Sequence, residues 1–197
     1  MTNPHLMSVA MMRISLKRMT SGRHHAAQLY RDCKGVVAVE FAAVLPLMLT
    51  MFLGAVELSN GVAIDRKVTL TVRTVTDLVS QSAVISNADM TNILNAAAKV
   101  MMPYPDTPMK IKVSAVDIAN DGSAKVAWGD SLNAAKRSTG SAVTLPAALA
   151  VPNTQLIFGE IEYSYAPPVG YAMVGSINLN ENFYVRPRQS STVTRIP

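Results

Sequence analysis

Beyond Gly35 the sequence contains no histidine and no cysteine, although the chain has 197 residues. The three histidines and the single cysteine all precede that glycine: His5, His24, His25 and Cys33. Residues 36–197 therefore have no imidazole base, thiol nucleophile, disulfide, or nitrogen or sulfur metal ligand. This excludes a Ser-His-Asp or Cys-His catalytic site there, and the remaining polar groups suggest no catalytic constellation. We expect no enzyme activity, no cofactor and no metal site.

Excess positive charge is also missing from most of the chain. The formal net charge is +5, which by itself would suggest nucleic acid or anionic lipid as a partner. Residues 1–35 contain six lysines and arginines and one acid, whereas residues 36–197 contain twelve charges of each sign. All of the net charge lies in the first 35 residues, so nucleic-acid binding by the larger part of the chain loses its main support.

One long stretch is almost free of charge. The 21 residues from Val36 to Val56 contain a single charged side chain, Glu40. About 20 mostly apolar residues in a helix cross a hydrocarbon core about 30 Å thick. The cations before this stretch hold the preceding segment in the cytoplasm, so the residues after it would be exported. The alternative is a buried helix of a large soluble domain, which the basic flank disfavours.

Three short motifs lie in this stretch and at its two ends, in a fixed order: Gly35 and Val36 followed by Glu40-Phe41, then Leu45-Pro46, then Gly54-Ala-Val-Glu57. Over roughly residues 34–80 this arrangement resembles the TadE-like (TadE/TadG-type) pseudopilins of the tight-adherence, or Flp-type, pilus assembly system. The resemblance implies cleavage between Gly35 and Val36 by a prepilin peptidase, and it assigns Glu40 and Phe41 to subunit assembly. The partners it implies are inner-membrane lipid, that peptidase, other pilins or pseudopilins, and the assembly machinery.

Glu40 is the only carboxylate within the apolar stretch. A charge at the bilayer centre costs about 2.5–3.5 kcal/mol, and less near the interface. The cleavage implied by the resemblance would create a partner for it, the free amine of Val36, in this subunit or a neighbouring one. In a medium of low dielectric constant a close pair of charges costs much less than two unpaired charges. Such a pair would fix the register between packed helices; in the alternative, Glu40 simply lies among the lipid headgroups.

The rest of the pattern predicts an α+β protein. Apolar residues at spacings of three to four, from Leu58 and Val62 onward, extend the first helix to about Gln81. A shorter helix follows Ser86 and ends before Pro103. Period-two alternation then predicts roughly four antiparallel strands with one buried face: 110–118 with a bulge at Val116, 123–128, 154–165, and a last extended piece within 183–196. We expect a basic cytoplasmic leader at 1–35, a transmembrane and extended amphipathic helix at 36–82, and an exported α+β domain at 83–197.

Three features of this domain allow a functional interpretation. Trp128 fits a core residue better than a ligand platform, because it lies alone on an alternating strand. Glu160 and Glu162 share a strand face, and we expect them to pair with Arg186 and Arg188 across the sheet rather than to bind a cation. The apolar loop 166–176 fits a subunit contact and a loop folded over the sheet equally well.

The sequence therefore predicts a single-pass inner-membrane protein with a cytoplasmic N-terminus and a periplasmic C-terminal domain. As a pseudopilin or minor pilin it would help to assemble an adhesive Flp-type pilus. A second hypothesis is a secreted binding domain that signal peptidase releases after Ala63, because the small residues Gly61 and Ala63 follow an apolar core. Fractionation separates the two, since release would leave residues 64–197 soluble.

Overall fold

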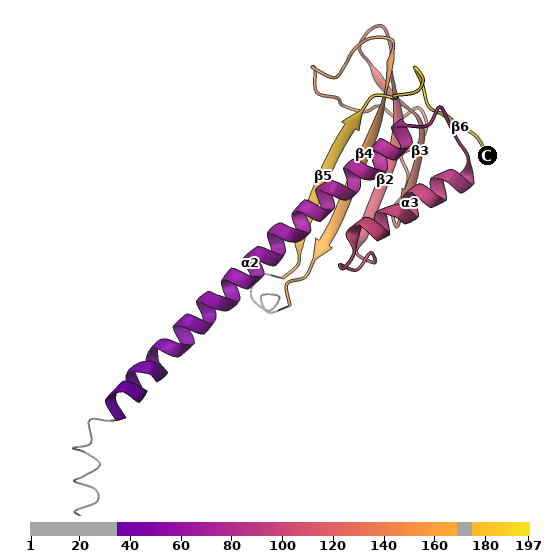
Figure 1. The fold of residues 1–197 in the computed structure, drawn as a ribbon. Coiled ribbons are helices and arrows are strands. Elements are labelled where there is room, and N and C mark those ends of the chain that lie inside the picture. Colours follow the sequence, from indigo (N-terminus) through magenta and orange to yellow (C-terminus); the bar gives the residue numbers. More distant parts are fainter. Residues whose placement is uncertain (1–34, 169–174) are drawn as a thin grey trace, which may run out of the picture. The chain divides into compact units, whose positions relative to one another are not determined.

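The computed structural model describes residues 35–168 and 175–197 (Figure 1), so most of the predicted leader and residues 169–174 of the apolar loop lie outside it. The chain divides into two units between Phe52 and Leu53. The described elements are α2 (Val36–Ser80), β1 (Val84–Ile85), α3 (Asn87–Met101), β2 (Met109–Ile118), β3 (Ala124–Leu132), β4 (Thr154–Tyr165), β5 (Ile177–Val185) and β6 (Thr194–Arg195). The predicted α+β class, with a long apolar N-terminal helix, a second helix and a four-stranded antiparallel sheet, is confirmed.

α2 is one continuous helix of 45 residues with Pro46 inside it. Its buried apolar residues recur at spacings of three and four, as a helix packed on one side requires: Ile64, Val68, Val72, Val75 and Val79. The predicted apolar face also included Leu58 and Val62, but these side chains are 71% and 46% exposed. Full burial of apolar side chains of α2 therefore begins at Ile64, about two turns later than the periodicity indicates.

The main sheet has the strand order β3-β2-β4-β5, and all neighbouring strands are antiparallel. In the turn between β2 and β3, the Ala119 N–H donates a hydrogen bond to the Ser123 carbonyl at 2.8 Å. Gly122 has a φ of +82°, a left-handed conformation that glycine adopts without a steric cost. The register of β2 against β3 shifts between Ala115 and Val116, which confirms the predicted bulge.

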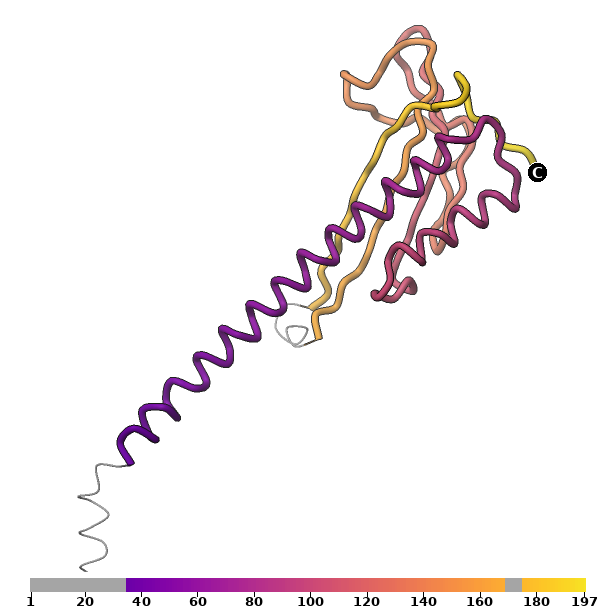
Figure 2. The backbone as a smooth tube through the Cα atoms, viewed as in Figure 1, coloured from indigo at the N-terminus to yellow at the C-terminus, as the bar shows by residue number. Residues whose placement is uncertain are grey.

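Two apolar clusters cover the two faces of this sheet, so the prediction of a single buried face is wrong. Because side chains alternate between faces along a strand, the odd-numbered residues of β4 from Ile157 to Tyr165 face one side, where the helices α2 and α3 pack on them. The neighbouring Leu156 and Phe158 face the other side, under Val143 and other residues of the 133–153 connection. Figures 1 and 2 show both helices crossing the same face of the sheet.

The C-terminal part differs from the prediction in two places. β5 begins at Ile177, six residues before the predicted extended piece. The three asparagines in Ile177–Asn182 give this segment the composition of a loop. In the strand they are exposed on the solvent-facing side of the sheet and alternate with the less exposed Leu179 and Glu181. The chain end then forms the two-residue strand β6, which pairs in parallel with β1. Trp128 is half-buried against the larger cluster and donates from its indole N–H to the Val193 carbonyl at 2.8 Å, in agreement with its interpretation as a core residue.

The start of α3 is fixed by a capping box between Ser86 and Asp89. The Ser86 hydroxyl accepts a hydrogen bond from the Asp89 N–H at 3.2 Å, and the Asp89 carboxylate accepts one from the Ser86 N–H at 3.0 Å. The Ser86 side chain also donates to that carboxylate at 2.7 Å. These hydrogen bonds, first that of the side chain and then that of the backbone, lower the pKa of Asp89.

A Ser86→Ala substitution is expected to lower the melting temperature by about 2–4 °C, because the helix loses its N-terminal cap. It should also weaken the acid dependence of stability. Since the pKa of Asp89 is lowered on folding, its contribution is present above the ordinary carboxyl pKa and is lost as the pH falls through the lower, folded-state pKa. Thermal unfolding at a series of acidic pH values measures both effects. Thr91→Ala, on the exposed surface of the same helix, is the control, and equal pH profiles for the wild type and Ser86→Ala would contradict the prediction.

Candidate assembly segment

Gly35 and Val36 lie at the start of α2. Gly35 is exposed and precedes the helix, and Val36, the first helical residue, is 53% exposed. A Cβ atom added at Gly35 would meet nothing within 4 Å, and the backbone there is not left-handed. Neither packing nor backbone conformation within the described chain therefore requires a glycine at position 35.

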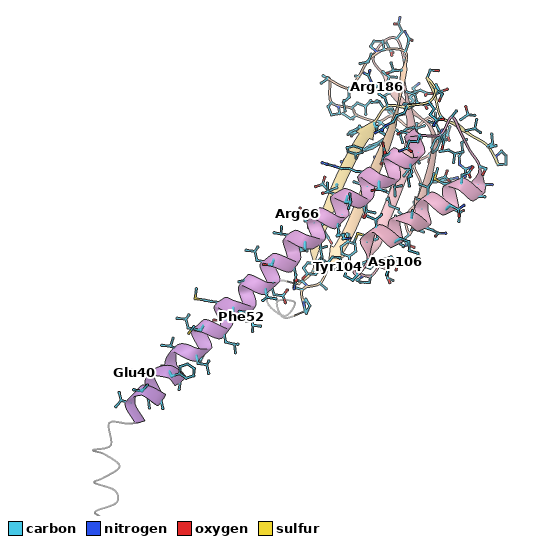
Figure 3. All side chains as sticks on the ribbon, in the orientation of Figure 1. Glu40, Phe52, Arg66, Tyr104, Asp106 and Arg186 are labelled. Atoms are coloured by element: carbon cyan, nitrogen blue, oxygen red, sulfur yellow. The ribbon has the colours of Figure 1, made fainter. Side chains whose placement is uncertain are left out.

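Glu40 follows Val36 by four residues, which is about one helical turn. Side chains four residues apart lie on the same side of a helix, and each Cα–Cβ bond leans toward the helix N-terminus. The first N–H groups of α2 lack partners within the helix and carry a partial positive charge. Glu40 is exposed (Figure 3), and no described lysine or arginine lies within ion-pair distance of it. Its carboxylate is thus available to a cation near the start of this helix.

The residues after Glu40 are apolar and exposed. The most apolar 18-residue window of α2 has a mean hydropathy of 2.3, and none of it is buried. Phe41 is 61% exposed and Phe52 is 64% exposed. Figure 3 shows Phe52 on this part of the helix. α2 is therefore long and apolar enough to cross a membrane, and the apolar surface of this window is not covered by the described chain. These properties are consistent with a single-pass membrane protein.

Two glycines of α2, Gly54 and Gly61, have open space beside them. A Cβ atom at either position would meet nothing within 4 Å. Glycine inside a helix costs about 1 kcal/mol relative to alanine, and packing within the described chain does not explain that cost. Small residues of this kind let a second helix approach closely in a membrane or at its edge.

Glu57 has a contact that sequence reasoning missed. The Tyr165 hydroxyl, at the end of β4, donates a hydrogen bond to the Glu57 Oε2 atom at 3.3 Å. Burial raises the pKa of Tyr165, and the charge of Glu57 raises it further. The motif that contains Glu57 gives no indication of this contact, which links the residue to the sheet. Strand alternation does place Tyr165 on the buried face, but it gives no indication of a partner on a helix over 100 residues earlier.

Glu160 does not pair with Arg186 or Arg188, so the predicted pairing is wrong for this residue. Its carboxylate accepts two hydrogen bonds from Arg137, at 2.6 Å from Nε and at 2.8 Å from Nη2. Arg137 also lies over the ring of Phe158, with 5.3 Å between the guanidinium carbon and the ring centroid. The hydrogen bond with Glu160 is the main reason that the pKa of Arg137 is raised. Arg137 thereby attaches the 133–153 connection to the sheet.

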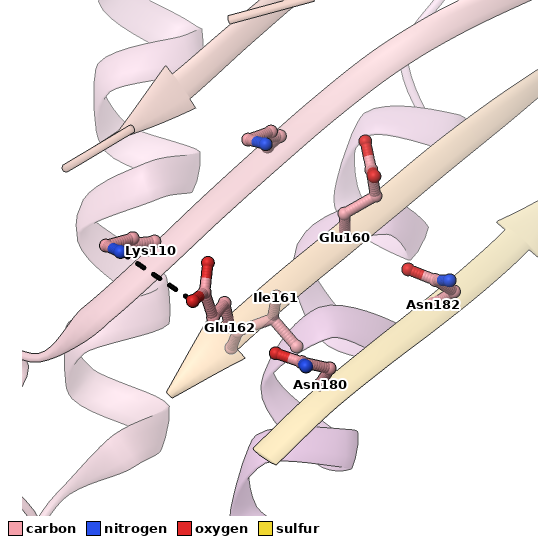
Figure 4. A pocket seen from close by; sticks show the side chains of 7 residues that line it. Lys110, Glu160, Ile161, Glu162, Asn180 and Asn182 are labelled. Carbon is pink, nitrogen blue, oxygen red and sulfur yellow. Dashed lines mark ion pairs between the residues drawn. The ribbon is translucent and has the colours of Figure 1, made fainter. Parts of the chain in front are cut away.

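The pairing predicted for Glu162 is also wrong. Its carboxylate lies 3.7 Å from Nζ of Lys110 on β2 (Figure 4). Across β5, Asn180 is opposite Glu162 and Asn182 is opposite Glu160, because β5 begins earlier than predicted. The arginines follow the strand instead of lying in it. The result is an open polar hollow of about 290 Å³ on this face of the sheet, with no free pair of glutamates.

Metal-binding groups are not assembled anywhere in residues 35–168 and 175–197. No three histidine, cysteine, aspartate or glutamate side chains lie close enough there to hold a metal ion. The distinctive chemistry of the described chain is therefore that of the α2 start: an exposed glycine, the first helical residue after it, and one carboxylate ahead of an uncovered apolar helix.

Comparison with protein families gives this segment an identity. The family model of the TadE-like proteins matches residues 35–77. This is a TadE-like segment. No curated protein and no solved structure matches the chain. The match confirms the resemblance drawn from the motifs, and the family implies involvement in Tad/Flp pilus assembly as a structural component.

The TadE-like segment contains all four residues predicted to matter for processing and assembly: Gly35, Val36, Glu40 and Phe41. It begins at Gly35 and includes most of α2, while the sheet and α3 lie outside it. The roles of the four residues stay predictions. The structure adds that all four are exposed, so each is accessible to a partner.

Proposed function

We propose that this chain is a pseudopilin or minor-pilin-like subunit of the Tad/Flp pilus assembly system. In this proposal residues 1–35 form a cytoplasmic leader, residues 36–82 include an inner-membrane span, and residues 83–197 form an exported domain. The observation that carries the proposal is the TadE-like segment, which begins at the glycine of the proposed cleavage site. The uncovered apolar helix directly after that glycine supports it.

The proposed processing step is hydrolysis of the Gly35–Val36 peptide bond by a prepilin peptidase. Water adds to the Gly35 carbonyl carbon, the C–N bond breaks, and the products are a Gly35 carboxylate and a Val36 amine. Gly35 is exposed and has no side chain, so nothing in the described chain blocks an approach to the bond. The new N-terminus would coincide with the first residue of α2, and the helix would therefore survive the cleavage intact.

The Val36 amine would be protonated, and its charge would lie at the positive end of the helix dipole. That arrangement is unfavourable in an apolar environment without a nearby carboxylate. Glu40 is the only carboxylate among the first 21 residues of α2. Its position one turn from Val36 lets it meet the amine of its own chain or that of a neighbouring subunit. Pairing between subunits would fix their relative register along the helix axis.

N-terminal sequencing and intact mass of the protein purified from membranes test the processing step. The mature chain is expected to begin at Val36. Gly35→Phe should abolish cleavage because the bulky side chain would stand at the scissile bond, whereas Gly54→Ala, a glycine outside the site, should be processed normally. A mature chain that begins elsewhere would contradict the proposal. A soluble fragment that begins at Ile64 would instead support release by signal peptidase after Ala63.

A further inference from the structure

β5 is an edge strand with one free side. It pairs along all nine residues with β4, without a register shift, and it is the last strand in the order β3-β2-β4-β5. No residue of β5 is buried. In the described part of the chain no other backbone segment forms hydrogen bonds with β5. A long, regular edge of this kind presents a row of unpaired N–H and C=O groups that can template another strand.

The opposite edge of the sheet is protected. The β3 residue Val126 donates a hydrogen bond to the Ser141 carbonyl at 3.0 Å and accepts one from the Gly140 N–H at 2.7 Å. The pairing of β3 also contains the bulge at Ala115/Val116. Coverage, bulges, lysine and proline are the usual protections of an edge strand. β5 has no lysine, proline or bulge, and its one charged side chain is Glu181, so this edge has fewer protections than the edge at β3.

Positive charge lies beside the C-terminal half of this free edge. Arg73 of α2 is exposed, with its guanidinium carbon 5.5 Å from the centroid of the Phe183 ring. Arg186 is exposed and directly follows the strand (Figure 3). Among the described residues neither arginine has a carboxylate within ion-pair distance, whereas the nearby Arg188 is paired with Asp77. A hollow of about 250 Å³, lined in part by Arg73, Phe183 and Arg188, opens here.

We propose that the free edge of β5 binds an extended, acidic segment of another protein, which adds to the sheet as a fifth strand. Backbone hydrogen bonds to β5 would supply much of the affinity, as in other cases of strand addition. Acidic side chains of the segment would lie near Arg73 and Arg186. Farther along the same face, an apolar side chain of the segment would lie beside Leu179, which is only partly buried.

A second copy of β5 is a poor occupant of this edge. β5 runs from Ile177 to Val185, so its centre is Glu181. Antiparallel pairing of two copies over the full strand length would place the two Glu181 side chains directly opposite one another. Like charges in opposite positions destabilise a strand pair. The edge therefore fits a different chain, with acidic residues opposite Phe183 to Arg186 instead of opposite Glu181.

The experiment uses the full chain in detergent micelles. The probe is a fluorescent peptide of alternating valine and serine with two consecutive glutamates at the end that would pair beside Phe183 to Arg186, and no glutamate opposite Glu181. The peptide is expected to bind, and amide hydrogen exchange at residues 179–185 should slow when it is present. The same peptide with lysine in place of glutamate should not bind. A version with methylated backbone nitrogens keeps the side chains and charge but loses the N–H donors, so it should not bind either.

Two matched variants test the charge requirement. Arg73→Glu with Arg186→Glu should weaken binding of the acidic peptide about tenfold, because two attractive contacts become repulsive. Lys99→Glu with Lys136→Glu changes the net charge equally at exposed positions outside the proposed site, and should change affinity less than twofold. Circular dichroism and thermal unfolding check that both variants are folded.

Three outcomes would overturn the inference: equal binding of the methylated peptide, equal binding of the lysine peptide, or protection from exchange outside β5. None of them bears on cleavage after Gly35, which is read from the N-terminus of the mature chain. The inference about β5 and the proposed processing step can therefore fail separately.

Discussion

Gly159→Ala is expected to destabilise the sheet and helix unit by about 1–3 kcal/mol, the usual cost of overpacking a core. Gly159 lies in β4 directly under α2. A Cβ atom there would lie 2.0 Å from the Thr76 Oγ1 atom and 3.0 Å from a Val72 methyl group. Thr76 is fully buried, and its hydroxyl donates a hydrogen bond to the Val72 carbonyl at 2.6 Å. Since Thr76 has little freedom to move, the helix would have to shift away from the sheet.

Denaturant or thermal unfolding of the full chain in detergent measures this effect. Thr76→Ala removes the nearest atom, so the Gly159→Ala/Thr76→Ala double variant should be more stable than the sum of the two single effects predicts. The matched control is Gly61→Ala in α2, where a Cβ atom would meet nothing within 4 Å. That change should be neutral or stabilise the protein by up to about 1 kcal/mol. Equal effects of Gly159→Ala and Gly61→Ala would contradict the close helix–sheet contact.

Gly159 illustrates what the sequence could and could not provide. The strand 154–165 is predicted with its correct bounds, and Ile157, Ile161 and Tyr163 lie on the predicted buried face, because period-two alternation is a local property of the chain. The prediction of a single buried face is wrong, since Leu156 and Phe158 are buried on the other side by residues of a connection distant in sequence. The function of one glycine within this strand depends on a helix about 80 residues earlier, and no local pattern contains that information. The same holds for the hydrogen bond from Tyr165 to Glu57.

Two wrong predictions, the start of β5 and the partner of Glu160, have a common physical origin. In the first half of β5 and around Arg137, polar residues suggest a loop. In the structure these residues lie on a partly exposed face of the sheet. Asn178, Asn180 and Asn182 belong to a strand because the solvent-facing side of β5 tolerates amides beside the glutamates of β4. Arg137 lies in a connection without regular structure, yet its two hydrogen bonds to Glu160 fix that connection on the sheet. Which side chains pair between two strands depends on which residues lie opposite one another, and the sequence does not specify this register.

The candidate assembly segment was more accessible to sequence reasoning than the sheet. Its motifs, apolar run and helical continuation are all local, and the structure places Gly35, Val36 and Glu40 together at one helix start. The partners of these residues would be another subunit, a peptidase and lipid. A single chain therefore presents the residues exposed, and their roles have to be tested by experiment.

Glu40→Ala is expected to leave cleavage after Gly35 largely intact but to reduce the yield of assembled pili at least tenfold. Removing one member of a close charge pair in an apolar environment leaves the other charge unpaired, at a cost of about 3–5 kcal/mol. Glu40→Gln should have a similar effect, because it keeps the size of the side chain and removes only the charge. Pili sheared from cells and counted by electron microscopy measure assembly, and N-terminal sequencing of the same cells measures processing.

Thr50→Ala is the matched control for this substitution, since Thr50 is a second exposed polar residue of the same apolar stretch and its hydroxyl donates a hydrogen bond to the Leu47 carbonyl within the helix. It should assemble normally, which would show that loss of a polar group from the stretch is not itself harmful. Normal piliation of Glu40→Ala would refute the pairing with the Val36 amine. Loss of cleavage in Glu40→Ala would instead assign Glu40 to recognition by the peptidase. Only normal processing combined with failed assembly fits a carboxylate whose partner is the amine that cleavage creates.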